Sequence, residues 1–126
     1  MTASVVTSKF GEVDSITIAG RLTAAEAPKV RGDVLDTVER GAARVVLDLS
    51  RLEYCDSSGL SVLISALRAA RTRDGNVALA GLTPSVRALI ELTRLHQVFE
   101  IFDDAQLAAE RMNWSSPPAA GAANVR

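Results

Sequence analysis

The chain of 126 residues has one cysteine, one histidine and five aromatic side chains, and it lacks a long hydrophobic run. The single cysteine, Cys55, excludes an internal disulfide and cannot by itself supply a metal site, so we expect no bound metal. With so few aromatic residues, the core must be built from Leu, Ile, Val and Ala. That composition is typical of a sheet covered by helices.

A clustered basic face is also missing. The formal net charge is −1, and the Lys and Arg residues are scattered among acids. Duplex DNA and anionic membranes select basic faces, so we expect no nucleic-acid partner. The apolar runs fall far short of the roughly 18 residues of a spanning helix, and residues 1–20 lack the basic start and apolar block of a secretion signal. We therefore expect a cytoplasmic protein with no direct membrane insertion.

Two motifs of enzymes are absent as well. Without a phosphate-cradling Gly-x-x-x-x-Gly-Lys loop, we expect no cofactor, and any ATP should belong to a partner. The chain also lacks the Gly-x-Ser-x-Gly elbow of many hydrolases. A serine hydrolase would need the sole histidine, His96, to meet Ser57 or Ser58, and nothing in the spacing places it there. We therefore expect that the protein is not an enzyme.

The length and the composition, with 48% hydrophobic and 23% charged residues, describe one domain, which we place at residues 1–113. Residues 114–126 have no periodicity and are expected to form a disordered tail. Alternation of apolar and polar residues predicts a hairpin at the start of the domain, and short apolar runs predict further strands. The expected strands are 4–10, 13–19, 45–49 at the sheet's centre, 77–82 and 98–102.

Apolar residues at helical spacing predict four helices between these strands. The first spans about Ala24 to Arg40 and opens on Thr23-Ala24-Ala25-Glu26, which has the spacing of a capping box. The others run from Asp56 to about Arg73, from the Thr83-Pro84 pair onward, and over residues 103–112. The fold class is therefore α/β, with a mixed sheet of about five strands and about four helices in the order ββαβαβαβα.

The residues Asp56-Ser57-Ser58-Gly59-Leu60 stand where an apolar strand region gives way to the second helix. A serine at a helix start can cap the free N–H groups of the first turn. An exposed serine there can instead carry a phosphate, which the same N–H groups and the helix dipole favour. The spacing leaves both roles open for Ser57, while Asp56 can cap the helix and Gly59 can permit a close approach.

These residues resemble a known family. Together with Val45-Val46-Leu47-Asp48-Leu49 and Tyr54-Cys55, the Asp-Ser-Ser-Gly motif is similar to that of the bacterial anti-sigma factor antagonists, whose domain is called STAS. Agreement extends over roughly residues 5–110. It includes Gly20-Arg21-Leu22-Thr23, the strand-to-helix turn at 80–86 and the closing segment at 92–102.

The resemblance implies a STAS fold and a regulatory role. In that family, the first serine of the motif, here Ser57, is phosphorylated by an anti-sigma factor that is also a serine kinase. The unphosphorylated antagonist binds this partner and frees a sigma factor, and a serine phosphatase restores binding after phosphorylation. The chain is thus expected to be a phosphoprotein of transcription regulation that works by partner switching. Its expected partner-binding residues are Asp56, Ser58, Gly59, Leu60, Arg21 and Thr23.

The chain departs from the family pattern at two of these positions. Thr23 replaces the usual aspartate, and Arg21 replaces a frequent acid, so the local charge changes sign beside the phosphoacceptor loop. A capping role for Thr23 would explain the first change. Which kinase reads Ser57 is left open, and Ser58 is the alternative phosphoacceptor. A second function for the same fold also stays open, as a STAS subunit of a membrane transport complex of the lipid or ABC type that needs no phosphorylation.

Overall fold

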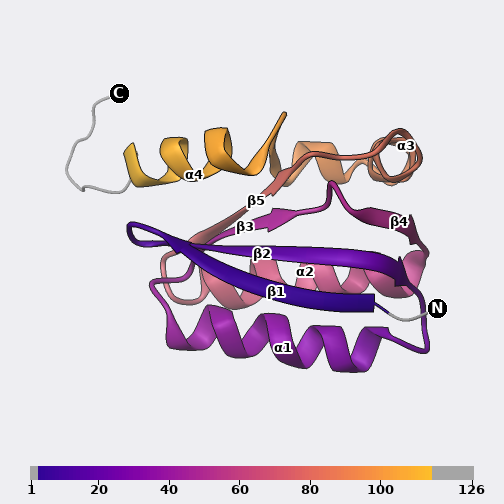
Figure 1. Ribbon diagram of the computed structural model, residues 1–126, viewed down its shortest axis with the longest axis horizontal. Coiled ribbons are helices and arrows are strands. Elements are labelled where there is room, and N and C mark those ends of the chain that lie inside the picture. Colours follow the sequence, from indigo (N-terminus) through magenta and orange to yellow (C-terminus); the bar gives the residue numbers. More distant parts are fainter. Residues whose placement is uncertain (1–2, 115–126) are drawn as a thin grey trace.

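The computed structural model describes residues 3–114, which form one mixed sheet with helices on both faces (Figure 1). The strands are β1 (Ala3–Phe10), β2 (Val13–Leu22), β3 (Arg44–Asp48), β4 (Leu52–Cys55), β5 (Asn76–Ala80) and β6 (Glu100–Phe102). The helices are α1 (Ala27–Arg40), α2 (Ser57–Arg71), α3 (Pro84–Leu92) and α4 (Ala105–Trp114), with a short 3-10 turn η1 (Leu95–Gln97). The α/β class and the helix order are those that the sequence predicts.

The sheet follows the order β1-β2-β3-β5-β6, and β4 pairs with β2 beside that path. Only the β1–β2 hairpin is antiparallel, while the other pairs are parallel. The predicted central strand is confirmed, because β3 lies between β2 and β5 and its Val45, Val46 and Leu47 are fully buried. The sequence of a strand that is paired on both sides and covered on both faces is typically a continuous apolar run.

The two faces of the sheet carry separate cores. Helices α1 and α2 cover one face and build the main core with the strands, whereas α4 covers part of the opposite face (Figure 1). Small residues let α4 pack closely, since Ala108 and Ala109 lie against Val46 and Ala78. Aliphatic side chains dominate both cores, as the composition predicts.

Strand β4 was not expected, so the described residues contain six strands rather than about five. Strand β2 forks: Asp14–Thr17 pair with β3, and Gly20–Leu22 pair with β4, with a register shift between Gly20 and Arg21. A short turn separates the two partners of β2, and the carbonyl of Arg51 within it accepts from the Gly20 amide. The four residues of β4 are too short and too irregular in burial to show an alternating pattern.

The predicted capping box does not form, and α1 begins at Ala27 rather than near Ala24. The Glu26 carboxylate accepts the backbone N–H of Ala3 at 3.2 Å, so a contact with β1 occupies the group that the box requires. Thr23 contributes its carbonyl, which accepts from the amides of Glu26 and Ala27. The proposed capping role of the Thr23 hydroxyl is therefore wrong.

Other boundaries move by a few residues. Helix α2 ends at Arg71, and the Thr83 hydroxyl donates to the Leu52 carbonyl at 3.4 Å instead of capping α3. The expected edge strand shortens to β6, because Val98 and Phe99 form the turn after η1 and donate their amides to the Leu95 carbonyl. Helix α4 starts two residues later than expected, after Asp104 caps it through the Leu107 amide, and it continues to Trp114. The rest of the predicted tail, residues 115–126, lies outside the described residues.

Candidate functional site

The loop between β4 and α2 is shaped by Asp56, which occupies the N-cap of α2. Its Oδ1 accepts from the amides of Ser58 at 2.9 Å and Gly59 at 3.1 Å. The Asp56 amide donates to the Leu22 carbonyl at 3.3 Å, which ties the cap to the end of β2. A carboxylate at an N-cap satisfies free donors of the first turn and complements the positive end of the helix. Asp56 is therefore the residue that caps α2.

Ser57 is consequently not needed as a cap. It occupies the first position of α2 and is exposed, and the structure gives its hydroxyl no hydrogen-bond partner among residues 3–114. Of the two roles that the sequence left open, the cap is therefore supplied by Asp56 and not by Ser57.

Gly59 and Leu60 lie behind this hydroxyl rather than at the surface. A Cβ on Gly59 would lie 2.5 Å from the Cys55 Sγ and 2.9 Å from the Leu22 carbonyl oxygen. The glycine thus allows the first turn of α2 to pack against the ends of β2 and β4. Leu60 is 5% exposed and belongs to the main core. Both residues position the loop, and neither presents a side chain to a partner in this structure.

Behind Ser57, a short chain of hydrogen bonds connects the two helices on this face of the sheet. The Arg31 Nη2 donates to the Ser61 Oγ at 2.9 Å, and that hydroxyl donates to the Ser58 carbonyl at 2.8 Å. Arg31 belongs to α1 and Ser61 to the second turn of α2. Sequence analysis missed this pair, although the spacing of Ser57 and Ser61 shows that they share a helix face.

Arg21 and Thr23 lie at the end of β2, beside the strand β4 that leads into the Ser57 loop. In the parallel pairing of β2 with β4, Arg21 is opposite Tyr54, and Leu22 is opposite Cys55. The Arg21 guanidinium stacks over the Tyr54 ring, 4.5 Å from its centroid. Both side chains are exposed, so this cation–π pair offers a positive and an aromatic surface near Ser57.

A cleft of about 380 Å³ continues this surface between β4 and α3. Its lining combines the apolar side chains of Leu89 and Leu92 with the polar groups of Asp56 and Ser85. Leu92 is 80% exposed, and Tyr54 at the same rim is 42% exposed. Exposed apolar side chains that gather beside a cleft are typical of protein-binding surfaces.

Cys55 forms the floor of this region. Burial raises the pKa of its thiol to about 11, and the nearby Asp56 charge adds to the increase. The Sγ contacts the Asp56 carbonyl at 3.4 Å and faces the Gly59 backbone. A thiol that stays protonated is a small core group and a poor nucleophile.

The structure separates the sole histidine from the serines. His96 lies in η1, and the neighbouring Val98 carbonyl accepts from Arg71 at the last turn of α2. Ser57 begins the same helix, about 20 Å away along its axis at ~1.5 Å per residue. A Ser-His pair for hydrolysis is therefore not assembled.

Residues 3–114 contain neither a candidate metal cluster nor a candidate membrane span. No group of three or more His, Cys, Asp or Glu side chains there could hold a metal ion. Within the same range, no helix is both long and apolar enough to cross a bilayer.

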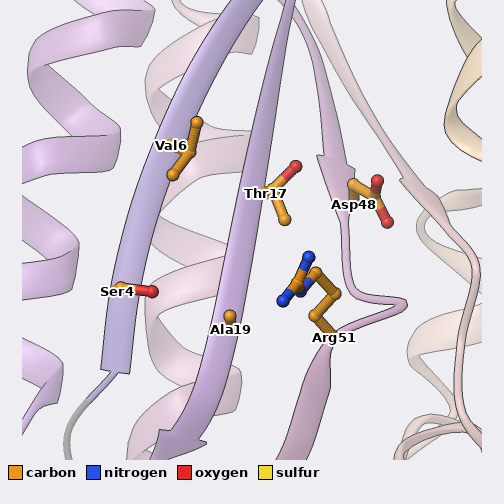
Figure 2. A pocket seen from close by; sticks show the side chains of 6 residues that line it. All are labelled: Ser4, Val6, Thr17, Ala19, Asp48 and Arg51. Carbon is orange, nitrogen blue, oxygen red and sulfur yellow. The ribbon is translucent and has the colours of Figure 1, made fainter.

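A second hollow, of about 460 Å³, lies over the part of the sheet that α4 leaves open. Figure 2 shows the Arg51 side chain pointing into it toward Thr17, with Asp48 on the neighbouring strand. The Asp48 carboxylate accepts from the amide and the hydroxyl of Ser50. This hollow is built from β1, β2, β3 and the turn after β3, separately from the cleft beside Ser57.

Comparison with known sequences decides the family. The family model described as "Mlab, STAS domain" matches residues 5–102. The chain belongs to the STAS domain family. It is 30% identical over 109 residues to BtrV of Bordetella bronchiseptica, whose name assigns it provisionally as an anti-sigma factor antagonist, with 84% of this chain and 94% of BtrV covered. It is 34% identical over 87 residues to the anti-sigma-B factor antagonist of Listeria monocytogenes, covering 68% of this chain and 75% of that protein.

Solved structures show the same STAS fold. An anti-sigma factor antagonist from Mycobacterium paratuberculosis superposes with a TM-score of 0.80 at 21% identity, covering 88% of this chain and 94% of that chain. The phosphorylated form of Bacillus SpoIIAA gives 0.68 at 17% identity, with 86% and 98% covered. The murine anion transporter Slc26a9 gives 0.74 at 16% identity, where the match covers 86% of this chain and 19% of the transporter. The fold therefore occurs both as a separate regulator and within a transporter.

Proposed function

We propose that this STAS protein is an anti-sigma factor antagonist that is switched off by phosphorylation of Ser57. In its unphosphorylated form it binds an anti-sigma factor with serine kinase activity and so frees a sigma factor. A serine phosphatase returns it to the binding form. The observation that carries this proposal is the division of labour at the start of α2, where Asp56 caps the helix and the Ser57 hydroxyl stays exposed and unengaged.

The relatives and the surface support the same role. BtrV and the Listeria protein are both named as antagonists of anti-sigma factors, and the fold relative SpoIIAA has a phosphorylated form. We assign partner binding to the half-buried polar groups around Ser57, namely Asp56, Ser58 and Thr23, and to the exposed Arg21–Tyr54 pair. The apolar rim at Leu92 extends that surface.

Electrostatics explains how phosphate can end binding without unfolding the protein. A phosphate adds about −1.5 to −2 charges at pH 7. At the N-terminus of α2 this charge is favoured by roughly 0.3 to 1 kcal/mol. In a packed interface, the same charge against Asp56 or partner acids costs several kcal/mol. A loss of about 4 kcal/mol weakens binding about a thousandfold.

The test combines phosphorylation with binding. Incubation with the cognate anti-sigma kinase and ATP should place phosphate on the peptide that contains Ser57, as peptide mass mapping shows. Ser57→Ala should stay folded, resist phosphorylation and bind the partner in the presence of ATP. Ser57→Glu should bind weakly in isothermal titration calorimetry. Ser58→Ala is the matched control for phosphorylation, because it removes the adjacent hydroxyl and should still accept phosphate on Ser57 as the wild type does.

Two outcomes would contradict the proposal. If Ser57→Ala still takes up as much phosphate as the wild type, Ser57 is not the phosphoacceptor. If Ser58→Ala in addition loses the phosphate, the switch lies at Ser58. Equal partner binding by the alanine and glutamate variants favours instead the transport-complex subunit, which needs no phosphorylation.

A further inference from the structure

Arg31 is placed where a phosphate on Ser57 would need a cation. Its guanidinium reaches across from α1 and donates to the Ser61 Oγ at 2.9 Å, one helical turn beyond Ser57. Side chains four residues apart on a helix share a face, with Cβ atoms about 5–6 Å apart. Ser57 and Ser61 are such a pair, so the guanidinium lies about one turn from the Ser57 hydroxyl.

The guanidinium also has donors to spare. Arginine carries five N–H donors in a planar fork, and the fork matches the geometry of a phosphate. Within residues 3–114, the bond to Ser61 is the interaction that the structure gives Arg31. A small rotation of the side chain can therefore bring free donors to the phosphate oxygens.

Other cations near this end of the helices are already engaged. Lys29 forms an ion pair with Asp33 at 3.3 Å on the exposed side of α1. Arg21 is stacked over the Tyr54 ring on strand β4. Arg31 differs from both, because its partner is a neutral hydroxyl on the same helix face as Ser57.

We propose that the Arg31 guanidinium binds the phosphate group carried by Ser57, an inference that rests on the phosphorylation proposed above. In the unphosphorylated protein, Ser61 holds Arg31 in place beside the first turn of α2. After phosphorylation, the phosphate links α1 to α2 through this side chain. Arg31 then shields the new charge and competes with the phosphatase for it, so it sets how long the switched-off state lasts.

The test places phosphoserine at position 57 of the full chain by chemical ligation or by codon reassignment, without any kinase. Phosphorus NMR then follows the second pKa of the phosphate, which is about 6 for an exposed phosphoserine. A neighbouring guanidinium favours the dianion and lowers that pKa. We expect Arg31→Ala to raise the phosphate pKa by about 0.5 to 1 unit relative to the wild type.

Three further variants complete the test. Lys29→Ala removes the same charge from the same helix and should leave the phosphate pKa unchanged. Ser61→Ala removes the neutral partner of Arg31 but leaves the guanidinium free to bind, so the phosphate pKa should stay low. Arg31→Lys keeps the charge without the fork and should give an intermediate value. It also replaces the alanine variant if that chain does not fold.

Loss of Arg31 should also speed removal of the phosphate by a serine phosphatase several-fold, with no change for Lys29→Ala. Equal phosphate pKa values in the wild type and Arg31→Ala would overturn the inference, even where the kinase assay places phosphate on Ser57. Conversely, failure of the kinase to phosphorylate Ser57 refutes the proposed function and leaves the NMR result to decide the role of Arg31 alone.

Discussion

At the residue scale, the start of α2 divides three tasks among neighbouring positions. Asp56 caps the helix, Gly59 lets the backbone approach the Leu22 carbonyl, and Ser57 is left exposed. Any side chain on Gly59 would push α2 away from β2 and β4. The hydroxyl proposed as phosphoacceptor therefore owes its position to the cap that Asp56 supplies and to the close packing that Gly59 permits.

Cys55 gives a prediction at this scale. Its thiol has a pKa of about 11 in the folded protein against an ordinary value of 9.0, because it is buried. Between pH 9 and pH 11 the unfolded chain releases this proton, whereas the folded chain keeps it. The stability that the raised pKa provides is therefore present below pH 9 and is lost as the pH rises toward 11. Urea unfolding of the wild type and Cys55→Ala should show this as a decline in the wild type alone.

Alkylation provides an independent check of the same thiol. At pH 8.5 the native protein should react with iodoacetamide far more slowly than the urea-unfolded chain. Native Cys55 that reacts at the rate of a free cysteine would contradict the burial described here.

At the scale of the elements, α1 and α2 are tied together at the ends away from Ser57. The Arg73 Nη1 donates to the Val38 carbonyl at 2.8 Å and to that of Glu39, while Nη2 donates to Gly41 at 3.3 Å. One side chain after α2 thus satisfies the last carbonyls of α1. Such bonds also complement the negative end of the α1 dipole.

Arg73→Ala should therefore lower the free energy of unfolding by about 1 to 2 kcal/mol, measured by urea denaturation. Arg40→Ala is the matched control, because its ion pair with Asp36 is solvent-exposed on α1. Exposed pairs of this spacing contribute about 0.3 to 0.5 kcal/mol. Equal losses for the two variants would show that the carbonyl contacts of Arg73 add nothing to stability.

The elements also show how far the sequence alone predicts the fold and the site. Apolar periodicity and the continuous run of β3 are local signals, so the four helices, the sheet class and the start of a helix at the Ser57 motif could be predicted. Contacts between distant segments could not. The Glu26 carboxylate accepts the Ala3 amide instead of completing the capping box, and Arg31 donates to Ser61, thirty residues away. Strand β4 exists because β2 is long enough to pair with it.

At the scale of the whole molecule, protection is expected to fall from the centre of the sheet to its edges. The β3 residues Val45, Val46 and Leu47 are fully buried, while most of the edge strand β1 is exposed, with Val6 at 64%. Amides in a central strand exchange only when the whole domain unfolds, whereas edges open locally.

Hydrogen exchange followed by mass spectrometry should therefore find the slowest exchange in peptides that contain Val45 to Leu47. Peptides from β6, which has three residues, should exchange earliest among the strands. Comparable protection of β6 and β3 would mean that the sheet opens only as one unit. The Ser57→Glu chain should give the same pattern, because the proposed switch changes the surface and not the fold.

The fork of β2 has a consequence for how such regulators diversify. The central pair, β2 with β3, and the pair that carries the serine loop, β2 with β4, use different parts of one strand. The exposed positions of residues 52–60, such as Glu53 and Tyr54, are thus an exchangeable cassette that can accumulate substitutions, while the buried Leu52, Gly59 and Leu60 keep the segment packed on the core. Under the proposed function, duplicated copies of such a domain can acquire different kinases and partners through this cassette, so that parallel signalling routes in one cell stay insulated from each other.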